Sequence, residues 1–183
     1  MEEAGADLIE LGIPFSDPTA EGPVIQAANV RALSGGVTTD KIFDMVRRIR
    51  QKTSIPMVFM TYANVVYSYG TERFAKAAAE IGMDGPILPD VPFEEKEEFA
   101  IPFKEHGLDL ISLIAPTSHE RIAMIAKEAE GFGISEPKQA KKMAAQSDGV
   151  IVGSAIVKLC EKYGADCVPN ISTFVKEMKD AIR

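Results

Sequence analysis

The stretch Leu8-Ile9-Glu10-Leu11-Gly12-Ile13 decides the fold, because it is a short apolar run with a single carboxylate inside it. Its length and composition predict a buried strand of a parallel sheet. A loop from Pro14 to Gly22 follows, and Pro23 then stands where the first turn of a helix accepts proline. Strand, loop and helix in this order form one β/α unit.

The rest of the chain repeats this alternation of short apolar runs and longer amphipathic segments. We predict five strands and a strand fragment near Phe132, with no linker between them. Pro102 is expected to kink or divide its helix. The predicted strands are residues 8–13, 57–61, 86–88, 110–115 and 149–152. The predicted helices are residues 23–35, 39–51, 74–81, a segment opened by Glu94–Glu98, 120–130, 137–145, a segment opened by Gly153-Ser154, and 171–182.

Repeated β/α units predict a (β/α)8 barrel, formed by a single domain over residues 1–183. A complete barrel of this type takes about 250 residues. The chain has 183 residues, so the expected barrel is incomplete. A doubly wound open sheet is the alternative, but it predicts a glycine-rich fingerprint after the first strand, and no GxGxxG follows Leu11.

The charge balance argues against nucleic acid as a partner. The formal net charge is −7, whereas recognition of a phosphate backbone needs a basic surface. The densest basic stretch is interpreted as the end of a helix, where cations complement the helix dipole. It consists of Arg47, Arg48, Arg50 and Lys52. Neither a membrane-spanning run nor a signal peptide is evident, which predicts a cytoplasmic protein.

The cysteines and histidines show no metal-ligand spacing. Cys160 and Cys167 form no CxxC motif and are interpreted as reduced thiols. His106 and His119 lie in separate polar segments, so we expect no metal site.

Glu10 is the most informative residue, since a carboxylate inside an apolar strand is costly to bury without a partner. At the carboxyl end of a barrel strand it would point into the barrel mouth, where such enzymes place catalysis. Burial there raises a carboxyl pKa, which suits a general acid or base. A structural glutamate with a paired partner is the alternative.

Other polar residues follow the predicted strands, and each also has a purely structural interpretation. Glu21 is either a site carboxylate or a solvated loop acid. Asp17 and Asp90 suit turns, because aspartate stabilises them. Tyr62 and Asn64 either line a site or cap the next segment.

Two late turns suggest a phosphate site. Gly133 precedes a helix start at Ser135, and Gly153 with Ser154 stands between an apolar run and a helix. Glycines allow close approach of the backbone, and helix N-termini present free N–H groups to an anion.

The run Ile9-Glu10-Leu11-Gly12-Ile13-Pro14-Phe15-Ser16-Asp17-Pro18-Thr19-Ala20-Glu21-Gly22-Pro23-Val24-Ile25-Gln26 resembles the signature of the tryptophan synthase alpha chain family. The segments Met60–Asn64, Leu88–Pro92, Gly131–Ser135 and Gly153–Lys158 agree with the same family, in order along the chain.

The resemblance implies a (β/α)8 barrel lyase of tryptophan biosynthesis that splits indole-3-glycerol phosphate into indole and glyceraldehyde 3-phosphate. It implies an alpha2beta2 heterotetramer with a beta chain that carries pyridoxal phosphate, and no cofactor in this chain. By the resemblance, Glu10 matches the acid that protonates the indole ring and Glu21 the carboxylate that holds the indole N–H. Its remaining matches are Gly133, Gly153 and Ser154 at the phosphate, Phe132 and Tyr62 near the indole, and Asp17 at the beta-chain interface.

The chain departs from the family pattern in two respects. The commonest family residue at the position of Glu21 is aspartate. The family also has a first strand and helix before the position of Met1, and a sixth strand, a mobile loop, a helix and most of a seventh strand between Glu130 and Gly131. A chain without these segments is expected to be weakly active or inactive. The rival hypotheses are an impaired barrel that binds the beta chain or small phosphorylated ligands, and a free-standing lyase.

Overall fold

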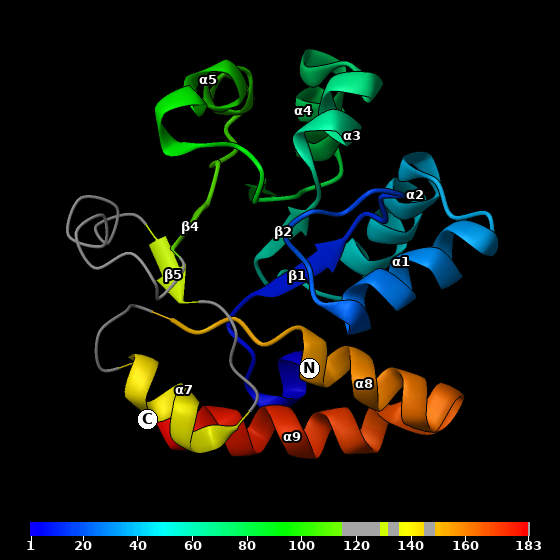
Figure 1. Cartoon of the computed structure of the whole chain (residues 1–183), viewed down its shortest axis with the longest axis vertical. Coiled ribbons are helices and arrows are strands. Elements are labelled where there is room, and N and C mark those ends of the chain that lie inside the picture. Colours follow the sequence, from blue (N-terminus) through cyan, green and yellow to red (C-terminus); the bar gives the residue numbers. More distant parts are fainter. Residues whose placement is uncertain (115–128, 132–135, 145–148, 183) are drawn as a thin grey trace. The chain divides into compact units, whose positions relative to one another are not determined.

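The computed structural model describes residues 1–114, 129–131, 136–144 and 149–182. These residues belong to two units, each described by itself. We call Leu8–Ile111 the sheet unit, and Met1–Asp7 together with Ser112–Arg183 the C-terminal unit. In Figure 1 the sheet unit runs from dark blue to green, and the later part of the C-terminal unit is yellow to red.

The sheet unit is built on three parallel strands in the order β1-β2-β3. They are β1 (Ile9–Gly12), β2 (Met57–Met60) and β3 (Gly85–Ile87). Glu10 lies opposite Val58, and Val58 lies opposite Gly85. A parallel bridge from Ile87 to Ile111 continues the sheet beyond β3. The helices between and after these strands are α1 (Pro23–Ser34), α2 (Thr39–Arg50), α3 (Ala63–Tyr69), α4 (Thr71–Glu80) and α5 (Glu97–Glu105), with a short 3-10 helix η2 (Phe93–Glu95) before α5.

Local signals explain where the first two helices begin. Gly22 is the N-cap of α1, and Pro23 occupies the first turn, where its missing N–H costs nothing. Thr38 caps α2, since its Oγ1 accepts a hydrogen bond of 3.3 Å from the N–H of Lys41. The apolar face of α2 is buried through Ile42, Phe43 and Val46.

An aromatic cluster packs the helices onto one face of the sheet. The ring of Phe59 in β2 lies 5.3 Å from Phe43 of α2 and 5.9 Å from Phe74 of α4, between ring centroids. Phe74 also contacts Phe103 of α5 at 6.1 Å. All four rings are buried, so this cluster is the core that holds helices α2, α4 and α5 to the strands.

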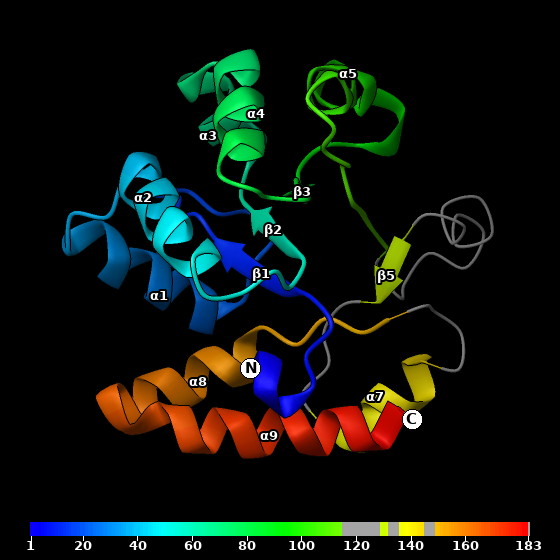
Figure 2. The same cartoon turned by 180° about the vertical axis from the view of Figure 1, so that it is seen from behind.

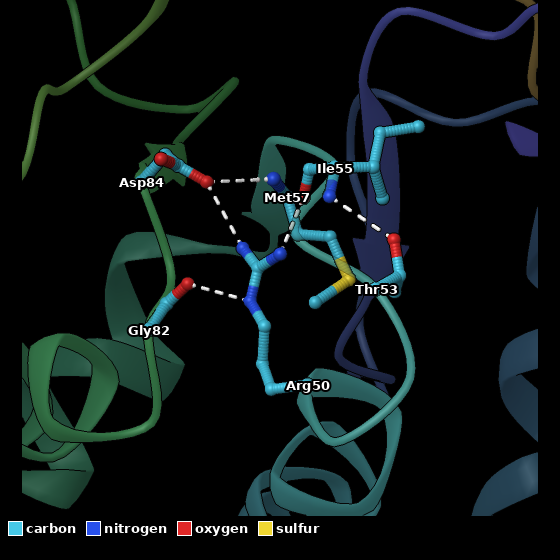
Figure 3. Close-up of polar contacts among 6 residues, drawn as sticks. All are labelled: Arg50, Thr53, Ile55, Met57, Gly82 and Asp84. Atoms are coloured by element: carbon cyan, nitrogen blue, oxygen red, sulfur yellow. Dashed lines mark hydrogen bonds and ion pairs between the residues drawn. The ribbon is translucent and has the colours of Figure 1, made fainter.

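Arg50 joins the end of α2 to the segments that enter β2 and β3 (Figure 3). Its Nε donates to the carbonyl of Gly82 at 2.8 Å, and one terminal nitrogen donates to the carbonyl of Ile55. The other terminal nitrogen lies 3.1 Å from the carboxylate of Asp84. The same carboxylate accepts the N–H of Met57 at 2.7 Å. One guanidinium therefore fixes the amino ends of two neighbouring strands.

The C-terminal unit consists mainly of helices. Its elements are a short 3-10 helix η1 (Glu2–Ala4), a parallel pair of short strands β4 (Ser112–Ile114) and β5 (Ala129–Gly131), and then α7 (Pro137–Ala144), α8 (Ser154–Tyr163), η3 (Gly164–Asp166) and α9 (Cys167–Ile182). Figures 1 and 2 both show α7 and α8 lying along α9. Ala140 of α7 and Met178 of α9 are the buried centre of this packing.

The predicted alternation of strands and helices is confirmed through β4, with shifts of a few residues at the ends. Helix α3 was not predicted, because its seven residues follow β2 with only two residues between. Pro102 lies inside α5 and does not divide it. No helix among the described residues is long and apolar enough to cross a membrane.

Two predictions in the later part of the chain are wrong. Ala129 and Glu130, expected to end a helix of residues 120–130, belong to β5, while residues 120–128 lie outside the described residues. Residues 149–152 are not a strand, since Val150 alone forms an isolated bridge. An apolar run becomes a strand only when a neighbour supplies a hydrogen-bonded ladder, and local composition does not contain that information.

Candidate active site

The direction of the Glu10 side chain follows from the strand register. Side chains alternate between the two faces of a strand, so Val58 faces away from the side on which Phe59 meets the helices. Glu10 pairs with Val58, and neighbours in register share a face of the sheet. The half-buried carboxyl group of Glu10 therefore lies on the face opposite to α2 and α4.

The carboxylate of Glu21 is held by side chains from two other elements of the sheet unit. Asn29 of α1 donates from Nδ2 to Oε2 of Glu21 at 3.0 Å. A second hydrogen bond joins the carboxylate to the hydroxyl group of Tyr62. Gln26 donates to the backbone carbonyl of Glu21 at 2.8 Å, so the loop is fixed as well as the side chain.

Tyr62 connects the end of β2 to the loop that carries Glu21. It is the N-cap of α3 and is only 2% exposed. Its hydroxyl oxygen accepts the backbone N–H of Ala20 at 2.9 Å. Its ring lies 5.2 Å from the ring of Phe15, measured between centroids. These contacts therefore hold the side chain of Tyr62 in place next to Glu21.

The surroundings shift the pKa values of both groups. Burial raises the pKa of Glu21 above its ordinary value, and the hydrogen bonds from Asn29 and Tyr62 oppose that rise. Burial also raises the pKa of Tyr62, and the charge of Glu21 acts in the same direction. A carboxylate destabilised by burial gains most from a ligand that offers an N–H group or a positive charge.

Asp17 lies on the exposed surface beside this site. Ser16 donates to its Oδ2 at 2.5 Å, which fixes the turn. Both residues line a surface hollow of about 280 Å³, together with Phe15, Pro18, Gln26 and Val30. The loop after β1 thus carries Glu21, and it also carries Asp17, which lines an open and partly apolar surface hollow.

Asp90 and Asn64 serve the structure of α3. Both carboxylate oxygens of Asp90 accept the N–H of Ala63, at 3.0 and 3.2 Å, at the start of this helix. The side chain of Asn64 accepts the hydroxyl of Ser68 at 2.9 Å. Among the alternatives left open for them, the geometry favours a structural role.

The predicted phosphate residues belong to the C-terminal unit. Gly153 is the N-cap of α8 and Ser154 its first residue, and both are exposed. A Cβ added at Gly153 would meet no atom of the described residues within 4 Å, so the backbone there leaves room for an approaching group. Gly133 and Phe132 lie outside the described residues.

Asn29 is the site residue that the sequence did not reveal. Gln26 and Asn29 stand three positions apart on α1 and both reach back to Glu21. That spacing places two amides on one helix face and is the sequence signal by which they could have been found. In the part of the chain that the structure describes, no three acidic, histidine or cysteine side chains are grouped to hold a metal ion.

Comparison with known proteins identifies the family. The family model described as tryptophan synthase alpha chain matches residues 1–132 and 127–183. The chain belongs to the tryptophan synthase alpha chain family. Among curated proteins, the tryptophan synthase alpha chain of Geobacter sulfurreducens is 42% identical over 223 aligned positions, which cover 100% of this chain and 84% of that protein. The protein of the same name from Lacticaseibacillus casei is 38% identical, with 100% and 83% covered.

Solved structures of the family agree with the fold. The tryptophan synthase alpha chain of Legionella pneumophila has 33% identity and a TM-score of 0.85, with 99% of this chain and 82% of that chain covered. The tryptophan synthase complex of Pyrococcus furiosus has 29% identity and a TM-score of 0.87, with 97% and 88% covered. The fold class is therefore the (β/α)8 barrel of this family, present here in incomplete form.

The family match is interrupted near residue 130. The family model matches in two pieces that meet at residues 127–132. The alignment with the Geobacter protein spans 223 positions, more than the 183 residues of this chain. Positions of the relative therefore lack a counterpart here, and the interruption lies where the sequence analysis places the missing segment.

Because the chain belongs to this family, its reaction class is that of the alpha chain. The alpha chain is a lyase of tryptophan biosynthesis that cleaves indole-3-glycerol phosphate to indole and glyceraldehyde 3-phosphate. Glu10 lies in β1, and Glu21 lies in the loop that follows this strand.

Proposed function

We propose that this chain cleaves indole-3-glycerol phosphate with Glu10 as the proton donor and Glu21 as the carboxylate that holds the indole nitrogen. The observation that carries the proposal is the fixed position of Glu21 between Asn29 and Tyr62. Glu10 stands on the face opposite to α2 and α4, in the strand that leads into the Glu21 loop.

The two carboxyl groups divide the chemistry. Glu10 gives its proton to the ring carbon that bears the glycerol chain, which turns the indole into a cation. Glu21 accepts the ring N–H and stabilises that cation, which in turn offsets the burial penalty on its charge. The Glu10 carboxylate left by that step then takes the hydroxyl proton of the glycerol chain. The carbon–carbon bond breaks, its electron pair neutralises the cationic ring, and indole and the aldehyde are released. One acid and one ionised carboxylate are a suitable pair for this sequence.

The phosphate is proposed to bind at the start of α8. The exposed backbone at Gly153 and Ser154 offers N–H groups at a helix N-terminus, which favour an anion. Gly133 is assigned to the same phosphate site, and Phe132 and Tyr62 to the indole pocket, on the family resemblance. Binding energy from the phosphate holds the reacting carbon in register.

We infer that the partner is a tryptophan synthase beta chain. A solved neighbour from Pyrococcus furiosus is described as an a2b2 complex. Asp17 stands on an exposed loop beside a surface hollow, a suitable place for such a contact. The proposed assembly is an alpha2beta2 heterotetramer in the cytoplasm. Pyridoxal phosphate is assigned to the beta chain, and this chain itself is proposed to use no cofactor.

Indole release from indole-3-glycerol phosphate, with and without a beta chain, tests the proposal. Glu10→Gln is expected to lower the rate by about 10²–10⁴-fold, because it removes a general acid. Its affinity for a phosphate-bearing ligand is expected to stay nearly unchanged. Glu80→Gln, an exposed change on α4, is the control. Equal turnover by wild type and Glu10→Gln would refute the assigned acid.

The interrupted family match favours a second candidate, a catalytically impaired barrel that binds the beta chain. An intact mass that matches the 183-residue sequence, together with beta-chain binding and no indole release, would establish it. A free-standing lyase would instead release indole at the same rate with and without the beta chain.

A further inference from the structure

The turn between α8 and α9 brings the two cysteines of the chain together. Cys160 lies in the last turn of α8, and Cys167 is the first residue of α9. The N–H of Gly164 donates to the carbonyl of Cys160, and the N–H of Cys167 donates to the carbonyl of Gly164. Gly164 has φ 55° and ψ −126°, a conformation that glycine adopts without strain. The turn therefore has a defined geometry, set by its glycine.

The two cysteines stand at the two ends of this hydrogen-bonded turn, and both are free thiols. Cys160 is exposed and Cys167 is partly exposed, so small reagents in solution reach the pair. Burial, followed by the proximity of Cys167, raises the pKa of the Cys160 thiol, which keeps the resting pair protonated. Two thiols at the ends of one short turn need little movement to bond.

We propose that Cys160 and Cys167 form a reversible disulfide, by exchange with a low-molecular-weight disulfide such as oxidised glutathione, that clamps α8 to α9. The first cysteine to ionise attacks one sulfur of the small disulfide, which forms a mixed disulfide and expels one small thiolate. The second cysteine then loses its proton and attacks the protein sulfur of the mixed disulfide. The bond between the two cysteines forms, and a second small thiol leaves with the proton. Two protein thiols are oxidised, and one small disulfide is reduced.

The disulfide would hold α8, the helix that begins at Ser154, to α9. It closes a short loop around Gly164 and restricts the unfolded chain, so the oxidised protein is expected to melt at a higher temperature. The inference does not depend on the proposed catalytic function, because it rests on the helical turn alone.

Redox titration of the full chain tests the clamp. The reduced protein is equilibrated with mixtures of reduced and oxidised glutathione, then alkylated and digested with trypsin, which cleaves after Lys162 between the two cysteines. Peptides Leu159–Lys162 and Tyr163–Lys176 are expected to appear joined, with a mass lower by two hydrogen atoms than the reduced pair. The melting temperature is expected to rise on oxidation and to return after dithiothreitol.

The variants Cys160→Ser and Cys167→Ser are the controls. Each is expected to stop at a single glutathione adduct and to show no rise in melting temperature on oxidation. Two independent adducts on the wild-type chain, a disulfide between two chains, or thiols that stay reduced in the most oxidising mixture would each overturn the proposal. The same rise in melting temperature in Cys167→Ser would also overturn it, because the shift would then not come from the clamp.

Discussion

The side-chain amide of Asn29 donates a 3.0 Å hydrogen bond to the carboxylate of Glu21, eight positions earlier in the chain. This bond stabilises the ionised form of Glu21 against the effect of burial, which raises its pKa. Asn29 is thus a positioning residue, because it affects activity by stabilising the ionised side chain of Glu21.

Asn29→Ala should therefore move the acid limb of the pH profile of indole release. Without the amide, the pKa of Glu21 rises further, so the ionised form needed for catalysis is lost at a higher pH than in the wild type. As pH falls, activity of the variant should decline earlier. The measurement is kcat/KM for indole-3-glycerol phosphate as a function of pH.

Gln26→Ala is the matched control for that shift. Its amide bonds the backbone carbonyl of Glu21 and not the carboxylate. It is expected to loosen the loop and raise KM, while the acid limb stays in place. If both variants shifted the limb equally, the direct bond from Asn29 would not be its cause.

Glu21→Asp tests how the longer side chain is accommodated. Aspartate is shorter by one carbon–carbon bond, about 1.5 Å, which takes the carboxylate out of hydrogen-bond reach of Asn29. We expect Glu21→Asp to keep cleavage activity, since the charge remains, but to become insensitive to Asn29→Ala. A double-mutant cycle on the acid limb measures this coupling. Additive shifts in the double variant would contradict the model of a direct contact.

The strand pattern singled out Glu10, whereas Glu21 and Tyr62 were assigned to the site by the family resemblance, and the catalytic roles of the two carboxylates stay predictions. The structure brings Tyr62 next to the loop that carries Glu21. Asn29 was missed because a polar residue on an amphipathic helix is usually solvated, and its partner was visible only once the loop was folded.

The wrong predictions share one physical cause, the non-local origin of β-structure. Ala129 and Glu130 ended a segment read as helical, yet they pair with Ser112 and Leu113. The apolar run from Gly149 to Val152 was read as a strand, yet it forms no ladder among the described residues. Helix α2 depends on local periodicity and its cap, and its bounds were predicted within one residue.

Arg50→Met is expected to destabilise the sheet unit. The change leaves the carbonyl groups of Gly82 and Ile55 and the carboxylate of Asp84 without the guanidinium. The Arg50 side chain is only 17% exposed, so water replaces these bonds incompletely. The expected loss in the free energy of unfolding is about 1–3 kcal/mol, measured by urea denaturation.

Arg47→Met provides the comparison on the same helix. Arg47 pairs with Asp44 one turn away, and both side chains are more than half exposed. Such a pair contributes about 0–1 kcal/mol, so the urea midpoint should barely move. Equal midpoints for the two arginine variants would show that the contacts of Arg50 do not stabilise the strand ends.

Gly85→Ala should be the most damaging single methyl group in the sheet unit. A Cβ built at Gly85 in β3 would lie 1.8 Å from the backbone carbonyl oxygen of Asp109. The N–H of Asp109 also donates to the carbonyl of Asp84 at 3.0 Å, so the clashing backbone is held in place. Relief requires the strand or the segment at Asp109 to move, at an expected cost of about 1–3 kcal/mol or more.

Gly12→Ala separates that clash from the general effect of replacing a strand glycine. Gly12 ends β1 in the same sheet, and a Cβ there would meet no atom within 4 Å in the part of the chain that the structure describes. Because alanine loses less backbone freedom than glycine on folding, this variant should be neutral or slightly more stable in urea. The prediction is a large fall in the urea midpoint for Gly85→Ala and none for Gly12→Ala. Similar midpoints in both variants would contradict the close approach of β3 to Asp109.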